Sequence, residues 1–259
     1  MLYVKYLAMN LRALLEYRLS AALTALGQFL TAFSWFASIG LLFRRFGGIA
    51  GFSFAEAGLC FAVTNIAFSL SECFAKGFDS FSGMVIRGDF DRILLRPRNT
   101  VMQVLGARTE ITRIGRLVQA LIVLAMVIPR TGIAWSAGKV LTLVLMILGG
   151  AALFTGIFIL GATVCFFTLE GLEIINIFTD GGRELASYPL TVYGRRIRRF
   201  FTFIIPFGCV NYLPLMYLTG RAGDRPLLSM LAPLAGILFL LPCLAVWRAG
   251  VRRYTSSGS

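Results

Sequence analysis

LSAALTALGQFLTAFSWFASIGLLF, residues 19–43, is a run of 25 residues without a single charged side chain. A helix of about 20 apolar residues crosses the ~30 Å hydrocarbon core of a bilayer, where no water is available to pair with a free backbone N–H or C=O. Comparable uncharged runs recur along the chain. We therefore expect an all-α membrane protein with several transmembrane helices.

The composition leaves no room for a large soluble domain. Of the 259 residues, 58% are hydrophobic and 14% are charged, whereas soluble domains carry about 25% charged residues. We therefore treat residues 1–259 as a single transmembrane domain. The net charge of +13 comes largely from arginines at the ends of apolar runs, a pattern typical of contact with lipid headgroups. It predicts membrane lipid as a partner and no nucleic acid.

The sequence offers little for catalysis or metal binding. It contains no histidine, the commonest general base and metal ligand. Its five cysteines show no paired spacing and lie in apolar runs or at their ends, which indicates small buried side chains rather than disulfides or ligands. We therefore expect neither a catalytic residue nor a metal site in this chain.

Hydropathy predicts six spans and one interfacial helix. Lys5, Arg12 and Glu16 recur at helical spacing on one face, so residues 1–18 should lie in the interface plane. Five of the spans are expected at residues 19–43, 51–74, 112–129, 140–169 and 226–247. The third includes Arg113 and Arg116, which we expect to reach back to the interface.

The fifth span has two interpretations. In the first, the uncharged run 200–220 is the span and the residues before it form a loop. In the second, residues 172–190 are the span, and residues 200–220, which contain Pro206 and Pro214, dip into the outer leaflet and return. Hydropathy favours the first interpretation.

The charge distribution predicts the orientation. With the first interpretation and the N-terminus inside, 19 Lys and Arg residues lie on the inner side and 6 on the outer side. The positive-inside rule then makes both termini cytoplasmic. The longest polar segment, residues 76–111, is cytoplasmic as well.

Within that segment, residues 76–97 read KGFDSFSGMVIRGDFDRILLRP. Phe90, Ile93 and Leu94 share one helical face, flanked by charged residues, and a proline stops the turn. A short amphipathic helix in the cytosol requires an apolar partner groove, so this face predicts a docking site. The alternative is a solvated loop held at the headgroups by its arginines.

This helix, between the second and third spans, resembles the coupling helix of ATP-binding-cassette (ABC) exporters, specifically the permease subunit of type-2 exporters in a bacterial six-span subfamily. GRELASYPLTVY (residues 182–193), IIPFGCVNYLPLMYL (204–218) and the ending RRYTSSGS (252–259) share the resemblance. It implies that the ATPase-coupling residues are Gly88, Asp89, Phe90, Asp91, Arg92, Ile93, Leu94, Arg96 and Pro97.

The resemblance also implies a permease in the bacterial plasma membrane, acting as a homodimer or a heterodimer with a second permease. Two copies of an ABC ATP-binding subunit would bind the ATP and Mg. The chain has no G-x-x-x-x-G-K-[ST] motif for a phosphate, which agrees with a separate ATPase. The family plan favours the second interpretation of span five, with a re-entrant outer hairpin, and changes the charge count to 15 inside and 10 outside.

A polar stripe follows the fourth span. Glu173, Asp180 and Glu184 lie at i, i+7 and i+11, with Asn176 and Arg183 beside them. Inside a bundle or pore such a stripe would mark a pathway or an interface, whereas pairing within the helix would serve packing alone. The stripe is also the one feature that would suit the rival function, a secondary transporter or channel without an ATPase partner.

Overall fold

The computed structural model describes residues 2–48, 51–168 and 172–255, and all regular elements in these ranges are helices, with 81% of residues helical. The α-helices are α1 (Leu2–Glu16), α2 (Arg18–Phe46), α3 (Phe54–Asp79), α4 (Phe81–Ile86), α5 (Asp89–Leu94), α6 (Thr100–Ala107), α7 (Ile114–Val127), α8 (Ala137–Val164), α9 (Leu172–Ala186), α10 (Arg195–Phe203), α11 (Leu213–Leu218), α12 (Pro226–Leu231) and α13 (Leu234–Arg253). The 3-10 turns are Ile111–Arg113, Ile128–Arg130 and Leu190–Val192, and Gly208–Tyr212 is a π-helix. The predicted all-α class is confirmed.

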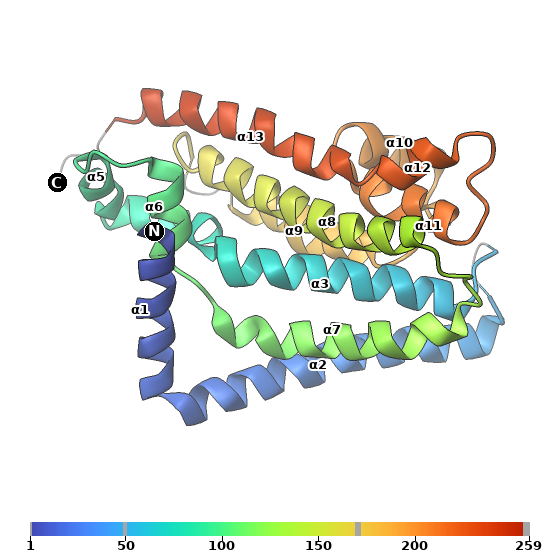
Figure 1. Ribbon diagram of the computed structural model, residues 1–259. Helices are drawn as coiled ribbons and strands as arrows, with labels where there is room; N and C mark the ends of the chain where they lie inside the picture. The colour runs from blue at the N-terminus through green and yellow to red at the C-terminus, as the bar shows by residue number, and fades with distance from the viewer. Residues whose placement is uncertain (1, 49–50, 169–171, 256–259) are drawn as a thin grey trace.

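The long helices α2, α3, α7, α8 and α13 run side by side in one bundle (Figure 1). Five stretches of the described chain are long and apolar enough to cross a membrane: Arg18–Arg45, Phe54–Ile86, Ile111–Arg130, Ala137–Val164 and Leu234–Arg253. The protein is therefore a multi-pass membrane protein.

The two ends of the bundle differ. One end, which we call the α5 end, carries α4, α5 and α6, and α1 crosses it transverse to the bundle axis (Figure 1). A helix in that position agrees with the predicted interfacial helix of residues 1–18. The other end, which we call the α11 end, carries α10, α11 and α12 (Figure 1).

The stretch predicted as the fifth span is broken. The apolar run 200–220 does not form one straight helix, because Arg195–Phe203 and Gly208–Leu218 meet at 88°. Pro206 lies at the bend, where it lacks an N–H and keeps the preceding residue out of the helical region. Helix α9 covers most of residues 172–190, but its 15 residues give a length of about 22 Å, shorter than the hydrocarbon core.

Helix α9 ends inside the bundle, where its last carbonyl needs a partner. The Thr64 hydroxyl donates to the Ala186 carbonyl at 3.0 Å, and the Asn211 amide donates to that carbonyl as well and to the Thr64 oxygen at 3.0 Å. Asn211 belongs to the π-helix. Side chains from two other elements thus satisfy backbone groups that lipid could not.

Glycines bring α8 and α13 into close contact. A Cβ atom on Gly149 would lie 2.2 Å from the carbonyl oxygen of Pro233, and one on Gly236 would lie 2.2 Å from that of Gly149. No side chain fits at either position, so the two backbones meet directly, as small residues allow in membrane helices.

Candidate functional site: the α4–α5 segment and its two junctions

A short helix, α5, forms where the coupling helix is predicted, and a sharp reversal of the chain sets it apart from α4. Gly88 adopts a left-handed conformation with φ of 68°, which glycine tolerates best, and α5 follows it. At the other end, the Gln103 side chain donates to the carbonyls of Ile93 at 3.4 Å and Arg98 at 3.2 Å. Helix α5 is therefore held from both sides even though it has only six residues.

Phe90 does not face a partner, so this part of the sequence prediction is wrong. Its ring is fully buried in a cluster that we call the aromatic junction, whose other members are Phe81, Phe166, Trp247 and Tyr254. The ring centroids lie 4.9 Å (Phe81), 5.2 Å (Tyr254), 5.5 Å (Phe166) and 6.1 Å (Trp247) from that of Phe90. Trp247 belongs to α13 and Phe166 follows α8 directly, so α5 is fixed to the ends of two long helices.

The apolar side chains that remain exposed on this segment lie at the C-terminal end of α5. Ile93 is buried, but Leu94 is 40% exposed and Leu95 is 85% exposed. Gly88, Asp89 and Asp91 form the start of the helix and its first turn. The side chains of Arg92, Arg96 and Pro97 are exposed, so an apolar tip surrounded by arginines faces outward.

The aromatic junction also changes the chemistry of its edge. Burial and the neighbouring Asp91 carboxylate both raise the pKa of Tyr254. A tyrosine phenol is already neutral at physiological pH, and this shift keeps it so; its ring packs against Phe90.

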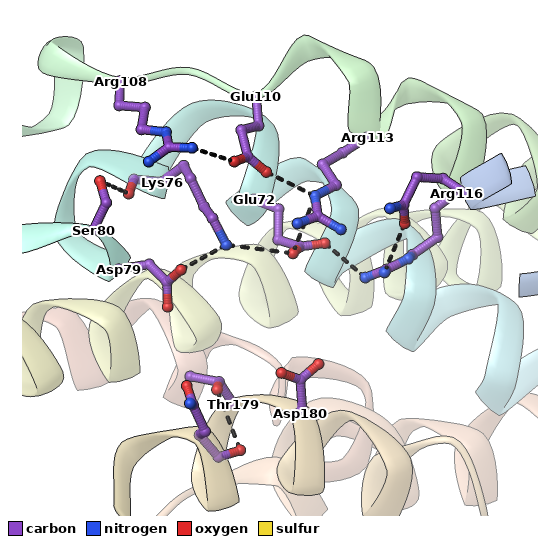
Figure 2. A network of polar contacts seen from close by, with 12 residues as sticks. Glu72, Lys76, Asp79, Ser80, Arg108, Glu110, Arg113, Arg116, Thr179 and Asp180 are labelled. Atoms are coloured by element: carbon purple, nitrogen blue, oxygen red, sulfur yellow. Dashed lines mark hydrogen bonds and ion pairs between the residues drawn. The ribbon is translucent and has the colours of Figure 1, made fainter. Parts of the chain in front are cut away.

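A second cluster, which we call the ionic junction, joins α3 to the segment before α7 (Figure 2). The Glu72 carboxylate, only 4% exposed, accepts from Arg116 at 2.6 Å and lies 3.4 Å from Arg113 and 3.8 Å from Lys76. Arg116 also donates to the Gln28 side chain of α2 at 3.0 Å. Arg113 and Arg116, the two arginines expected to reach the interface, thus share the Glu72 carboxylate of α3.

The ionic junction continues outward through Glu110, which accepts from Arg113 at 2.9 Å and Arg108 at 3.1 Å. Burial alone would raise the pKa of Glu110, but Lys76, Arg113 and Arg108 together lower it below its ordinary value. Lys76 completes the chain with an ion pair to Asp79 at 2.5 Å. Figure 2 shows Lys76 of α3, Arg113 of the α6–α7 connection and Arg116 of α7 converging on Glu72.

The polar stripe of α9 is only partly buried. Asn176 and Asp180 are exposed, and Asp180 points toward the ionic junction (Figure 2). Arg183 lies over the Phe68 ring, 5.2 Å from its centroid, and binds Glu184 at 2.6 Å and Asp180 at 3.8 Å. The predicted pairing within the helix is therefore present. The side chain of Glu173 lies outside the described residues.

Sequence reasoning missed Glu72 and Trp247 as site residues. A carboxylate in the second predicted span and two arginines in the third are together a signal for an ion pair between the spans. Trp247 carried no signal, because nothing in its own segment indicates contact with residues 81–90.

The described chain is thus a multi-pass helical bundle with a short amphipathic helix packed at one end. The family model described as "ABC-2 family transporter protein" matches residues 28–258, and the chain belongs to that family. It is thus a transporter permease. No curated protein and no solved structure matches the chain.

Proposed function

We propose that this chain is the membrane subunit of an ATP-driven exporter, working as a dimer with two separate ATP-binding subunits. Its family membership supports the class of transporter. The observation that carries the proposal is the tip Leu94–Leu95, which is exposed at the end of α5 although Phe90 and Ile93 of the same helix are buried. Such a tip is suited to a partner groove, because an apolar pair that its own chain leaves uncovered gains from burial elsewhere.

The aromatic junction supports a specific route of transmission. Because Phe90 packs against Trp247 of α13 and Phe166 beside α8, a displacement of α5 moves the ends of both long helices. The direct backbone contact between Gly149 and Pro233 joins those helices further along. Closure of the ATP-binding subunits would then act on α8 and α13 as one rigid body.

The proposed topology places the α5 end and both termini in the cytosol. Helix α9, extended by residues 187–190, would serve as the fifth span, and the bent pair α10–α11 would form a re-entrant hairpin in the outer leaflet. The 88° bend supports this, as does the arrangement of both helices at the α11 end (Figure 1). A cysteine in place of Arg196 should react with an impermeant reagent in intact cells; labelling only after permeabilisation would contradict the hairpin.

Two features support a dimer with a path between the subunits. The most apolar window of α2 is only 22% buried, which leaves a long face for a second permease. Asn176 and Asp180 on α9 are exposed, and a membrane protein keeps such groups away from lipid. We assign the stripe of α9 to the dimer axis or the pathway along it. ATP and Mg would be bound by the partner subunits.

The test is purification of the tagged chain from its native membrane together with any bound ATPase. We expect an ATP-binding subunit to copurify, and Leu95→Asp to remove it without loss of membrane insertion. Met102→Asp, a change at a 50% exposed position of α6, is the matched control and should retain the subunit. A chain that purifies alone and transports with a proton or sodium gradient would support the rival function, a secondary transporter.

A further inference from the structure

A groove runs beside α5, separate from the apolar tip. It has a volume of about 550 Å³, and its lining includes Arg87, Arg92, Arg96 and Arg108. Three of these arginines come from α5 and its flanks, and Arg108 follows α6. Two segments that are apart in the sequence thus place four guanidinium groups around one hollow.

The groove carries an excess of positive charge. The only acidic residue in its lining is Asp89, which lies 3.0 Å from Arg87 and 4.0 Å from Arg92. Arg96 donates to the Tyr6 hydroxyl at 3.3 Å, a neutral group. The Arg92 side chain is 77% exposed. Arg108 is also paired with Glu110, which lies outside the lining, at 3.1 Å. Two carboxylates cannot neutralise four guanidinium groups, so the groove attracts anions.

The position of the groove favours a protein over lipid. Helix α5 lies further from the bundle than α1 does (Figure 1), and α1 is the helix that we place at the headgroups. The groove also shares α5 with the exposed tip Leu94–Leu95. A partner that covers the tip therefore reaches the arginines in the same contact.

We propose that this groove receives an acidic segment of the ATP-binding subunit, whose Asp or Glu carboxylates pair with Arg92 and Arg96. The inference rests on the proposed function and adds the chemistry of the partner surface. Guanidinium groups bind carboxylates in pairs of parallel hydrogen bonds. Complementary charge at the edge of an interface mainly accelerates association, so the groove guides the subunit while the tip holds it.

The experiment measures binding of the purified ATP-binding subunit to the full-length permease in detergent at 50 mM and 500 mM salt. We expect Arg92→Glu to lower the association rate about tenfold at low salt and much less at high salt, because ions screen exposed charges. The matched control is Arg98→Glu, an exposed arginine on the same loop that does not line the groove. It should change the rate less than threefold.

The outcomes separate this inference from the proposed function. If the subunit binds the wild-type chain but Arg92→Glu and Arg98→Glu are equivalent, or the wild-type rate is independent of salt, the groove proposal is overturned and the exporter assignment stands. If no ATP-binding subunit binds even the wild-type chain, the assignment itself fails. If Arg92→Glu binds phosphatidylglycerol nanodiscs less tightly than the wild-type chain but binds the subunit as well as the wild type does, lipid is the occupant of the groove and the proposal is overturned. An Asp→Arg change in the subunit that restores the rate of Arg92→Glu would support it.

Discussion

The aromatic junction and the ionic junction both join the α5 end to the rest of the bundle, but through different kinds of interaction. The aromatic junction consists of rings, with Phe90 and Trp247 fully buried. The ionic junction consists of charges, with Glu72 shared among Arg113, Arg116 and Lys76. Packed rings have one close fit, because a core loses contact energy when a neighbour moves by even a fraction of an ångström.

Ion pairs behave differently, since the Glu72 carboxylate has three cations within 3.8 Å and keeps a partner when one of them moves away. The ionic junction can therefore rearrange while α3, α7 and α9 shift, whereas the aromatic junction keeps its geometry. This difference suggests a division of roles in the proposed exporter: the rings transmit a displacement, and the charges adapt to it.

The largest effect is expected from Phe90→Ala. Removing a fully buried ring costs about 3–5 kcal/mol of unfolding free energy, and the loss should be confined to α4 and α5. Trypsin should then cleave at Arg87 or Arg92 in the variant much faster than in the wild type. The control is Phe203→Ala, whose ring is exposed and whose change should leave the cleavage rate unaltered.

If the cleavage pattern of Phe90→Ala matched that of the wild type, the aromatic junction would not hold α5. If cleavage spread evenly over the whole chain, the junction would support the entire bundle rather than this segment. Either result would break the comparison.

A smaller effect, about 2–3 kcal/mol, is expected from Glu72→Gln. The substitution leaves Arg113 and Arg116 without their shared carboxylate, and an uncompensated buried charge is costly. Thermal unfolding in detergent measures the loss. Asp180→Asn, at a more exposed carboxylate near the same cluster, should change the stability by less than about 0.5 kcal/mol. Equal losses in the two variants would show that Glu72 has no special place in the ionic junction.

The two junctions also show what sequence can and cannot predict. The uncharged runs predicted the five long spans, because lipid forces an apolar run of that length into a helix. The position and amphipathic character of residues 88–97 also followed from local spacing. The pattern of Phe90, Ile93 and Leu94 identified an apolar face. Whether that face packs against its own chain or against a partner depends on Trp247, over 150 residues away.

The same limit explains the fifth span. Hydropathy favoured residues 200–220 as a span because it counts apolar side chains and ignores the bend at Pro206. The end of α9 at Ala186 depends on hydrogen bonds from Thr64 and Asn211, which lie in other elements. Pairings between distant segments, rather than local pattern, decide such boundaries.

An effect of intermediate size is expected from Trp247→Phe, and its dependence on salt distinguishes the two junctions. Trp247→Phe removes the hydrogen bond from its indole to Thr100 (3.3 Å) and part of the ring packing, so we expect a loss of about 1–2 kcal/mol. The loss should be the same at 50 mM and 500 mM salt, because no charge is involved. For Arg113→Gln, whose side chain is partly accessible, the loss should shrink at high salt. A salt-dependent Trp247→Phe effect would contradict the assignment of the rings to a charge-independent role.

The smallest effect is expected from Glu110→Gln, and its pH dependence reveals the sign of the electrostatic contribution. Because the surrounding cations lower the pKa of Glu110 in the folded chain below its ordinary value of 4.5, the ionised carboxylate stabilises the fold at neutral pH, by about 0.5–1 kcal/mol for partly exposed pairs. That contribution is fully present above pH 4.5 and is lost as the pH falls through the lower folded-state pKa. The difference in unfolding free energy between wild type and Glu110→Gln should therefore be constant from pH 8 to 6, and it should decline once the pH falls below 4.5 and through the lower folded-state pKa. For Trp247→Phe the difference in unfolding free energy from the wild type should be unchanged over the same pH range. A parallel decline in both variants would mean that acid destabilises the whole α5 end rather than the ionic junction alone.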